Sequence, residues 1–153
     1  MEKNENTSMT AKEYLREIRK MDLAIDQKQD EFDSLIKKRT YVGSMDYSSE
    51  RVQTSPDGSG FTGIADRLAD MQAEINEEID RYHDVRHERI NQIQQLSKTE
   101  YVDILFRRYV QYQSFETISS EMQKSYHRIC HLHGEALKEF ENKFLKTATN
   151  SKT

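Results

Sequence analysis

Glycine and proline are scarce in this sequence, with five glycines and a single proline among 153 residues. Both residues interrupt helices, so their scarcity allows long continuous helical runs. Apolar residues are also few, at 35% of the chain, while charged residues make up 33%. A compact globule of this length normally contains more apolar residues, whereas a long helix that pairs along one narrow seam needs few. The composition therefore predicts an all-helical protein that includes extended helices.

Cysteine and long apolar runs are lacking as well. Cys130 is the single cysteine, which excludes an internal disulfide and is typical of a reducing compartment. No stretch approaches the roughly 18 apolar residues of a membrane helix, and residues 1–8 lack the apolar core of a signal peptide. We therefore expect a soluble cytoplasmic protein with no membrane partner.

The net charge of −4 does not by itself indicate a nucleic-acid partner, but the charge is unevenly distributed. Residues 97–153 contain nine Lys and Arg against seven Asp and Glu, a net charge of +2, which leaves −6 for residues 1–96. Because phosphate groups repel acidic surfaces, a DNA contact is expected only in the C-terminal part.

Two long helices are predicted in the N-terminal part, from about residue 10 to 39 and from about residue 63 to 96. Residues 43–60 between them contain the turn sequence Ser55-Pro56-Asp57-Gly58. Apolar residues recur at steps of three and four along both helices, as in a coiled coil. The pattern predicts an antiparallel hairpin over residues 10–96, a coiled-coil arm that pairs with itself or makes a homo-oligomer. Lys28 is the one polar residue in the seam of the first helix. The apolar residues of that seam are Leu15, Ile18, Met21, Ile25, Phe32 and Leu35.

The acidic stretch from Glu74 to Asp80 lies on the second of these helices. Such a stretch is usually a solvated helix face, and a basic partner such as RNA polymerase is the alternative. Residues 1–9 and 147–153 are polar and are expected to be disordered.

Three shorter helices are predicted in residues 97–146. Ser97-Lys98-Thr99-Glu100 fits a capping box, in which Ser97 and Glu100 exchange hydrogen bonds at the start of a helix. The other two helices cover about residues 115–122 and 126–145, with Ser125 as the expected N-cap. The turn between them has no glycine, so Gln123 or Lys124 is expected to adopt a positive φ. A short helix, a tight turn and a longer helix form the pattern of a helix-turn-helix.

If residues 115–145 form a helix-turn-helix, the first turns of its last helix face outward. Candidate DNA contacts there are Ser125, Tyr126, His127, Arg128 and His131, because their side chains can donate to phosphates or to base edges. Arg128 is the best candidate for a bidentate contact to guanine. Lys124, Arg107 and Arg108 are candidates for holding the phosphate backbone.

The segments 104–110, 115–118 and 128–137 resemble region 4 of sigma-70-type factors. The chain from about residue 10 to 140 also resembles small phage proteins of Gram-positive hosts that are related to the ArpU and RinA late-gene regulators. The resemblance implies promoter-type DNA binding in a host cytosol, with the base-reading positions at Tyr126, His127, Arg128 and His131. Tyr126 and His127 replace an arginine and a glutamate that are usual there, so we do not expect a standard −35 hexamer as the target.

No enzymatic function is expected, because the sequence has no glycine-rich phosphate loop and Cys130 lacks the residues that would activate it. His127 and His131 have a spacing that can place two ligands on one metal ion, but no further ligands complete a site. We therefore expect no catalytic residues, metal site or cofactor.

The sequence-based hypothesis is a DNA-binding transcriptional regulator of a phage or mobile element, an activator of late genes that acts with host RNA polymerase. Two alternatives stay open. One is a DNA-packaging recognition subunit, which also joins a helix-turn-helix to coiled-coil helices. The other is a structural adaptor that binds no DNA.

Overall fold

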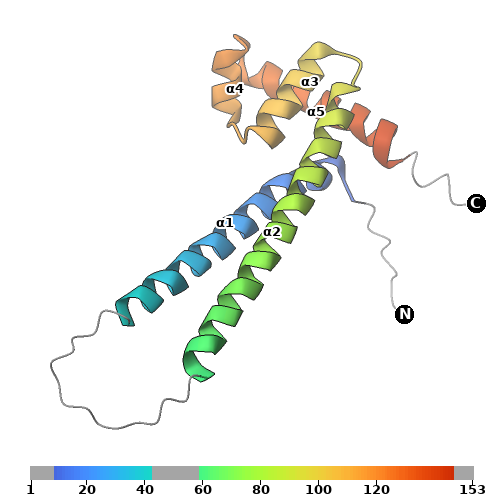
Figure 1. Ribbon diagram of the computed structural model, residues 1–153. Helices are drawn as coiled ribbons and strands as arrows, with labels where there is room; N and C mark the ends of the chain where they lie inside the picture. Colours follow the sequence, from blue (N-terminus) through green and yellow to red (C-terminus); the bar gives the residue numbers. More distant parts are fainter. Residues whose placement is uncertain (1–8, 43–58, 147–153) are drawn as a thin grey trace, which may run out of the picture. The chain divides into compact units, whose positions relative to one another are not determined.

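The computed structural model describes residues 9–42 and 59–146, and all regular structure in these residues is helical (Figure 1). This confirms the predicted all-α class, a helical hairpin followed by a helix-turn-helix-like domain. The elements are α1 (Ala11–Val42), α2 (Ser59–Gln94), α3 (Thr99–Leu105), η1 (Phe106–Val110), α4 (Phe115–Glu121), α5 (Tyr126–Phe140) and η2 (Glu141–Leu145). The elements η1 and η2 are π-helical turns that continue α3 and α5.

Most of the predicted 43–60 loop, and nearly all of the predicted disordered ends, lie outside the described residues. Helix α2 begins at Ser59, slightly earlier than the expected residue 63. Among the described residues, no helix combines the length and the apolar content that crossing a membrane requires.

The chain divides into two compact units, and both α1 and α2 run through both of them. The arm unit is Asp22–Arg81. The second unit, called here the helix-turn-helix unit, contains the described residues up to Met21 and from Tyr82 onward. The sequence-based boundary at residue 97 thus leaves out two helical segments that belong to this compact unit.

The arm unit is an antiparallel pair of helices, as the heptad pattern predicted. Ile25 of α1 is buried, as are Leu68 and Ile75 of α2. Lys28, the polar residue in the α1 seam, donates a hydrogen bond of 2.5 Å to Glu78, which raises the pKa of the lysine. The apolar pattern predicted along the second helix also includes Ile64, and there the prediction is wrong, because Ile64 is 48% exposed near the start of α2.

The helix-turn-helix unit has one hydrophobic core, and both long helices contribute to it. Tyr14 of α1 packs against Phe140 of α5 with 5.9 Å between ring centroids. Because α1 and α2 supply several fully buried aliphatic side chains, the shorter helices do not enclose this core alone. Its buried residues are Ala11, Leu15, Ile18, Ile93, Leu96, Tyr101, Ile104, Leu105, Tyr109, Val110, Ile118, Ile129, Leu132, Ala136 and Phe140.

A buried arginine joins the start of α1 to the end of α2. The side chain of Arg89 is 7% exposed and forms ion pairs with Glu17 at 3.0 Å and Glu88 at 2.8 Å. Its guanidinium lies over the Tyr14 ring, 3.5 Å from the ring centroid. A cation in this position is tolerated because carboxylates and an aromatic face replace much of its hydration.

The predicted capping box is wrong. Helix α3 begins after Lys98, which makes no side-chain cap. The Ser97 N–H and hydroxyl instead donate to the two carboxylate oxygens of Glu139, at 2.7 and 2.8 Å, and these hydrogen bonds lower the pKa of Glu139. Glu100 pairs with Lys124 at 2.9 Å. A carboxylate distant in sequence thus takes both donors of the serine, so the local cap does not form.

Candidate nucleic-acid interface

The turn between α4 and α5 determines the direction of α5 relative to α4. The Gln123 N–H donates to the Ser120 carbonyl at 3.3 Å, and the Lys124 N–H donates to the Ser119 carbonyl at 3.1 Å. These two bonds form a Schellman motif, which needs a left-handed residue directly after the helix. Gln123 adopts that conformation, with φ 51°. The expectation of a positive φ in this turn is therefore confirmed at Gln123.

Ser125 begins α5 as predicted. Its backbone is extended, and its hydroxyl accepts a hydrogen bond of 3.2 Å from the Arg128 N–H. Beyond the cap, one side of α5 is apolar and buried, through Ile129, Leu132 and Ala136. The opposite side is left in solvent because the helix is amphipathic.

The predicted base-reading residues share the exposed side of the first two turns of α5. Tyr126 is 50% exposed, and His127, Arg128 and His131 are exposed as well. Within the described part of the chain, the Arg128 guanidinium forms no hydrogen bond or ion pair. The structure thus brings four polar side chains together on one helical surface, and all of them contain hydrogen-bond donors.

Two of these side chains have neighbours that orient them. The Tyr126 ring packs edge-on against Phe115 of α4, with 6.3 Å between centroids, and the adjacent Cys130 thiol raises the pKa of Tyr126. His131 Nδ1 lies 3.5 Å from a Glu135 carboxylate oxygen, one helical turn further along α5. Both contacts restrict the rotamers of these two side chains.

The predicted phosphate-holding residues are engaged in contacts within the protein. Arg107 forms ion pairs with Asp103, at 2.6 Å, and with Glu121, and the hydrogen bond to Asp103 raises its pKa. Lys124 pairs with Glu100, which lowers the pKa of that carboxyl group. These cations lie on or next to α4 and η1, and their positive charge is largely compensated.

Arg108, the third predicted phosphate contact, supports the turn before α4. It donates a hydrogen bond of 2.7 Å to the Gln113 carbonyl, and its guanidinium lies 4.6 Å from the centroid of the Phe115 ring. Phe115 therefore contacts both Arg108 and Tyr126, which links η1 to the start of α5.

A partly buried aromatic cluster behind this surface was not predicted from the sequence. The Tyr109 hydroxyl lies 3.0 Å from His133 Nε2, the two rings stack, and Phe115 contacts His133 edge-on at 4.9 Å. Burial lowers the pKa of His133 to about 4 and raises the pKa of Tyr109 to about 12. The i, i+4 spacing of Ile129 and His133 was the available signal, because Ile129 belongs to the buried side.

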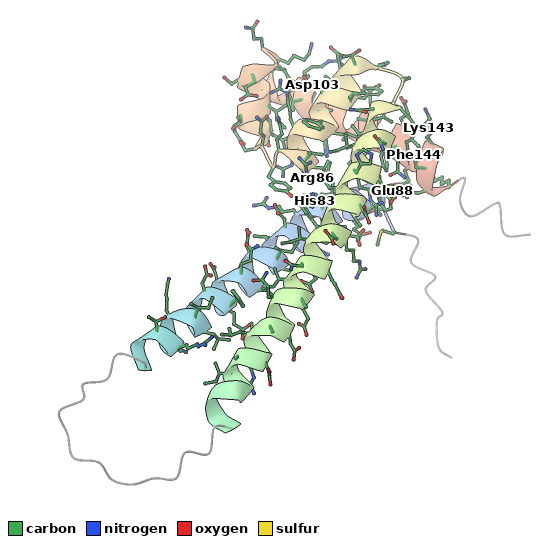
Figure 2. All side chains as sticks on the ribbon, in the orientation of Figure 1. His83, Arg86, Glu88, Asp103, Lys143 and Phe144 are labelled. Carbon is green, nitrogen blue, oxygen red and sulfur yellow. The ribbon has the colours of Figure 1, made fainter. Side chains whose placement is uncertain are left out.

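The interface can therefore donate hydrogen bonds and supply a positive charge at Arg128. Over the described ranges, no three His, Cys, Asp or Glu side chains come together in a way that could hold a metal ion. Figure 2 shows the side chains of the described residues, among them Asp103 on α3 and Glu88 on α2. No family model, curated protein or solved structure matches this chain.

Proposed function

We propose that this protein is a sequence-specific double-stranded DNA-binding protein that regulates transcription. The observation that carries the proposal is the exposed start of α5, where an unpaired Arg128 stands next to three other donor side chains. The buried side of the same helix and the α4–α5 turn hold this surface in place, as in a helix-turn-helix.

The start of α5 is suited to the major groove of B-DNA, which is about 12 Å wide and admits one helix. Arg128 makes a bidentate contact to guanine, because its guanidinium has no partner to give up in the described structure. Tyr126, His127 and His131 contact neighbouring base edges or phosphates. Contacts to base edges add selectivity, whereas contacts to phosphates position the protein on the duplex.

Regulation of transcription is the part of the proposal that rests on the sequence resemblance to phage late-gene regulators. On this hypothesis the protein activates late genes together with the RNA polymerase of a bacterial host. The acidic arm then serves homo-oligomerisation or contacts the polymerase.

The first experiment is a selection of binding sites from random duplex DNA with the full-length chain. On the selected duplex, Arg128→Ala should weaken binding by about 1–3 kcal/mol, roughly 5- to 150-fold, and relax selectivity at one base pair. Lys138→Ala, at an exposed position in the second half of α5, is the matched control and should keep selectivity. Equal losses on selected and random duplexes would argue against base reading by Arg128.

The second experiment tests transcription with purified host polymerase and the selected site placed upstream of a promoter. Footprinting at the promoter together with increased transcript supports the regulator. Ring assembly at a packaging start site with no effect on transcription would contradict it. The absence of any salt-dependent DNA binding would contradict the whole proposal.

A further inference from the structure

The start of α1 has three chemically distinct sides. Ala11, Leu15 and Ile18 are buried in the core of the helix-turn-helix unit. Glu13 and Glu17 lie to one side of this apolar stripe, as 100° per residue places them. The other side carries four cations, which we call the α1 basic flank: Lys12, Arg16, Arg19 and Lys20.

The basic flank lies beside the aromatic cluster that supports α5. The Arg19 guanidinium is 5.5 Å from the centroid of the Tyr112 ring, in the link after η1. Lys12 and Arg16 are close enough to His133 that, after burial and Arg108, their charges also lower the pKa of that histidine. The flank thus lies near His133, and Phe115, which contacts His133, also contacts Tyr126 at the start of α5.

The four cations of the flank are available to a partner. All four are exposed, and within residues 9–42 and 59–146 none of them forms an ion pair with a carboxylate. Arg107 and Lys124, in contrast, are paired with carboxylates in the same unit. Positive charge that is not held in an ion pair thus lies on α1 within this unit, outside the residues 97–153 whose net charge was counted in the sequence.

We propose that the α1 basic flank binds the phosphate backbone of the duplex whose bases contact α5. This inference rests on the proposed DNA-binding function and assigns the sequence-independent part of the affinity to the flank. Several cations along one helix side can neutralise several phosphates, and this neutralisation releases condensed counterions. The flank carries no base-reading role.

The test uses the full-length double variant Lys12→Gln/Arg16→Gln, with binding measured by fluorescence anisotropy on the selected duplex and on a random duplex. Loss of two phosphate contacts should weaken both complexes equally, by about 10- to 50-fold at 0.1 M KCl. The slope of log K against log salt should become less steep by about 2. The charge-retaining variant Lys12→Arg/Arg16→Lys should bind like the wild type.

Lys37→Gln/Lys38→Gln on the arm unit is the matched control, because it removes the same charge from exposed positions of the same helix. It should leave affinity and salt slope unchanged. Thermal unfolding of each variant confirms that it is folded, which is expected since the replaced side chains are exposed.

Four outcomes would overturn the inference in distinguishable ways. Unchanged affinity and slope in Lys12→Gln/Arg16→Gln would refute the flank but leave DNA binding by α5 intact. A loss confined to the selected duplex would show base reading instead of phosphate binding. A change in self-association with unchanged DNA binding would assign the flank to the acidic arm of a second copy. Failure of the wild type to bind any duplex would refute the proposed function and the flank together.

Discussion

At the scale of single residues, His133 shows how burial converts a polar side chain into part of a core. Its ring stacks on Tyr109 and contacts Phe115, and burial lowers its pKa to about 4. The folded protein therefore holds this histidine neutral at pH values at which an unfolded chain protonates it. Protonation of His133 opposes folding, because the charged ring would lose its hydration.

The sign of the resulting pH dependence follows from proton binding. Below about pH 6.5 the unfolded chain binds a proton at His133, whereas the folded chain does so only near pH 4. The free energy of unfolding should thus fall by about 1 kcal/mol between pH 7 and pH 5, less than the full shift implies because the ring is partly exposed. Urea unfolding at both pH values measures it. His133→Gln should remove this contribution, and His127→Gln, at an exposed position, should keep it.

If His133→Gln kept the wild-type difference between the two pH values, the histidine would not be held neutral by the fold. Between pH 5 and pH 7 the titration of His133 is separated from that of the shifted carboxyl groups. The pKa values of Glu13, Glu100 and Glu139 are lowered from 4.5, so these groups change charge below this range.

Residue types predicted the exposed side of α5, but they did not predict which of the other cations form ion pairs within the protein. In the sequence, Arg128 and Arg107 are both candidates for a DNA contact, one with a base and the other with the phosphate backbone. Asp103 precedes Arg107 by four residues, so that ion pair was visible as a helix spacing. Glu121 is fourteen residues away, and its approach to Arg107 depends on the packing of α4. For the same reason, neither Lys124–Glu100 nor the basic flank beside His133 could be foreseen.

At the scale of elements, the α4–α5 turn determines the angle at which α5 is presented. Its Schellman bonds place Gln123 at φ 51°, a conformation that costs a residue with a Cβ atom about 1 kcal/mol. The hydroxyl of Ser119 adds a hydrogen bond of 2.6 Å to the Lys124 carbonyl. The turn is thus held by several bonds although one residue is strained.

Gln123→Gly should therefore stabilise the protein by about 0.5–1 kcal/mol, because glycine adopts a positive φ without a steric penalty. Thermal or urea unfolding followed by circular dichroism would measure this change. Gln111→Gly is the control: Gln111 has φ −98°, so glycine there gains nothing and should be neutral or destabilising. A destabilised Gln123→Gly variant would show that the left-handed turn does not form in solution.

Local patterns predicted elements well when the interaction that decides them is itself local. Ser125 caps α5 through a hydrogen bond three residues along the chain, and this was foreseen. Ser97 has the same local signal three residues before Glu100. Ser97 does not cap the helix, because its N–H and hydroxyl donate to the two carboxylate oxygens of Glu139, which is 42 residues away. A long-range acceptor with a full charge outcompetes a local cap.

At the scale of the whole molecule, the helix-turn-helix unit is assembled from two separate parts of the chain. Leu15 and Ile18 of α1 and Ile93 of α2 are fully buried among the residues of α3–α5. Burying an aliphatic side chain of this size contributes about 1.5–3 kcal/mol, and a domain of this size is stable by only about 5–15 kcal/mol. The segment 97–146 is therefore not expected to be a stable domain by itself.

A fragment of residues 97–153 should consequently unfold without a cooperative transition. A chain in which residues 22–81 are replaced by a flexible linker of about ten residues, long enough to span roughly 17 Å, should retain one. Thermal unfolding of both chains by circular dichroism makes the comparison. A fragment 97–153 that melts as cooperatively as the full-length chain would show that α1 and α2 are dispensable for this fold.

The heptad pattern predicted both long helices and their antiparallel pairing, because a seam repeats within each helix. The pattern could not show which seam residues pack within the arm unit and which pack in the core of the helix-turn-helix unit. Ile18 and Ile25 occupy equivalent heptad positions, yet Ile18 is in that core and Ile25 is in the arm. That division depends on contacts of α1 with α5, such as Tyr14 with Phe140, which no periodicity within one helix encodes.

The participation of α1 in this core has a consequence for biosynthesis. The Ala11 N–H donates to a carboxylate oxygen of Glu141, 130 positions later in the chain. A nascent chain can form α1 and α2 early, because helices need only local bonds, but the core stays open until α5 has left the ribosome exit tunnel. Closure of the helix-turn-helix unit therefore has to wait for α5, and until then the apolar side of α1 lacks the partners that bury it in the finished core.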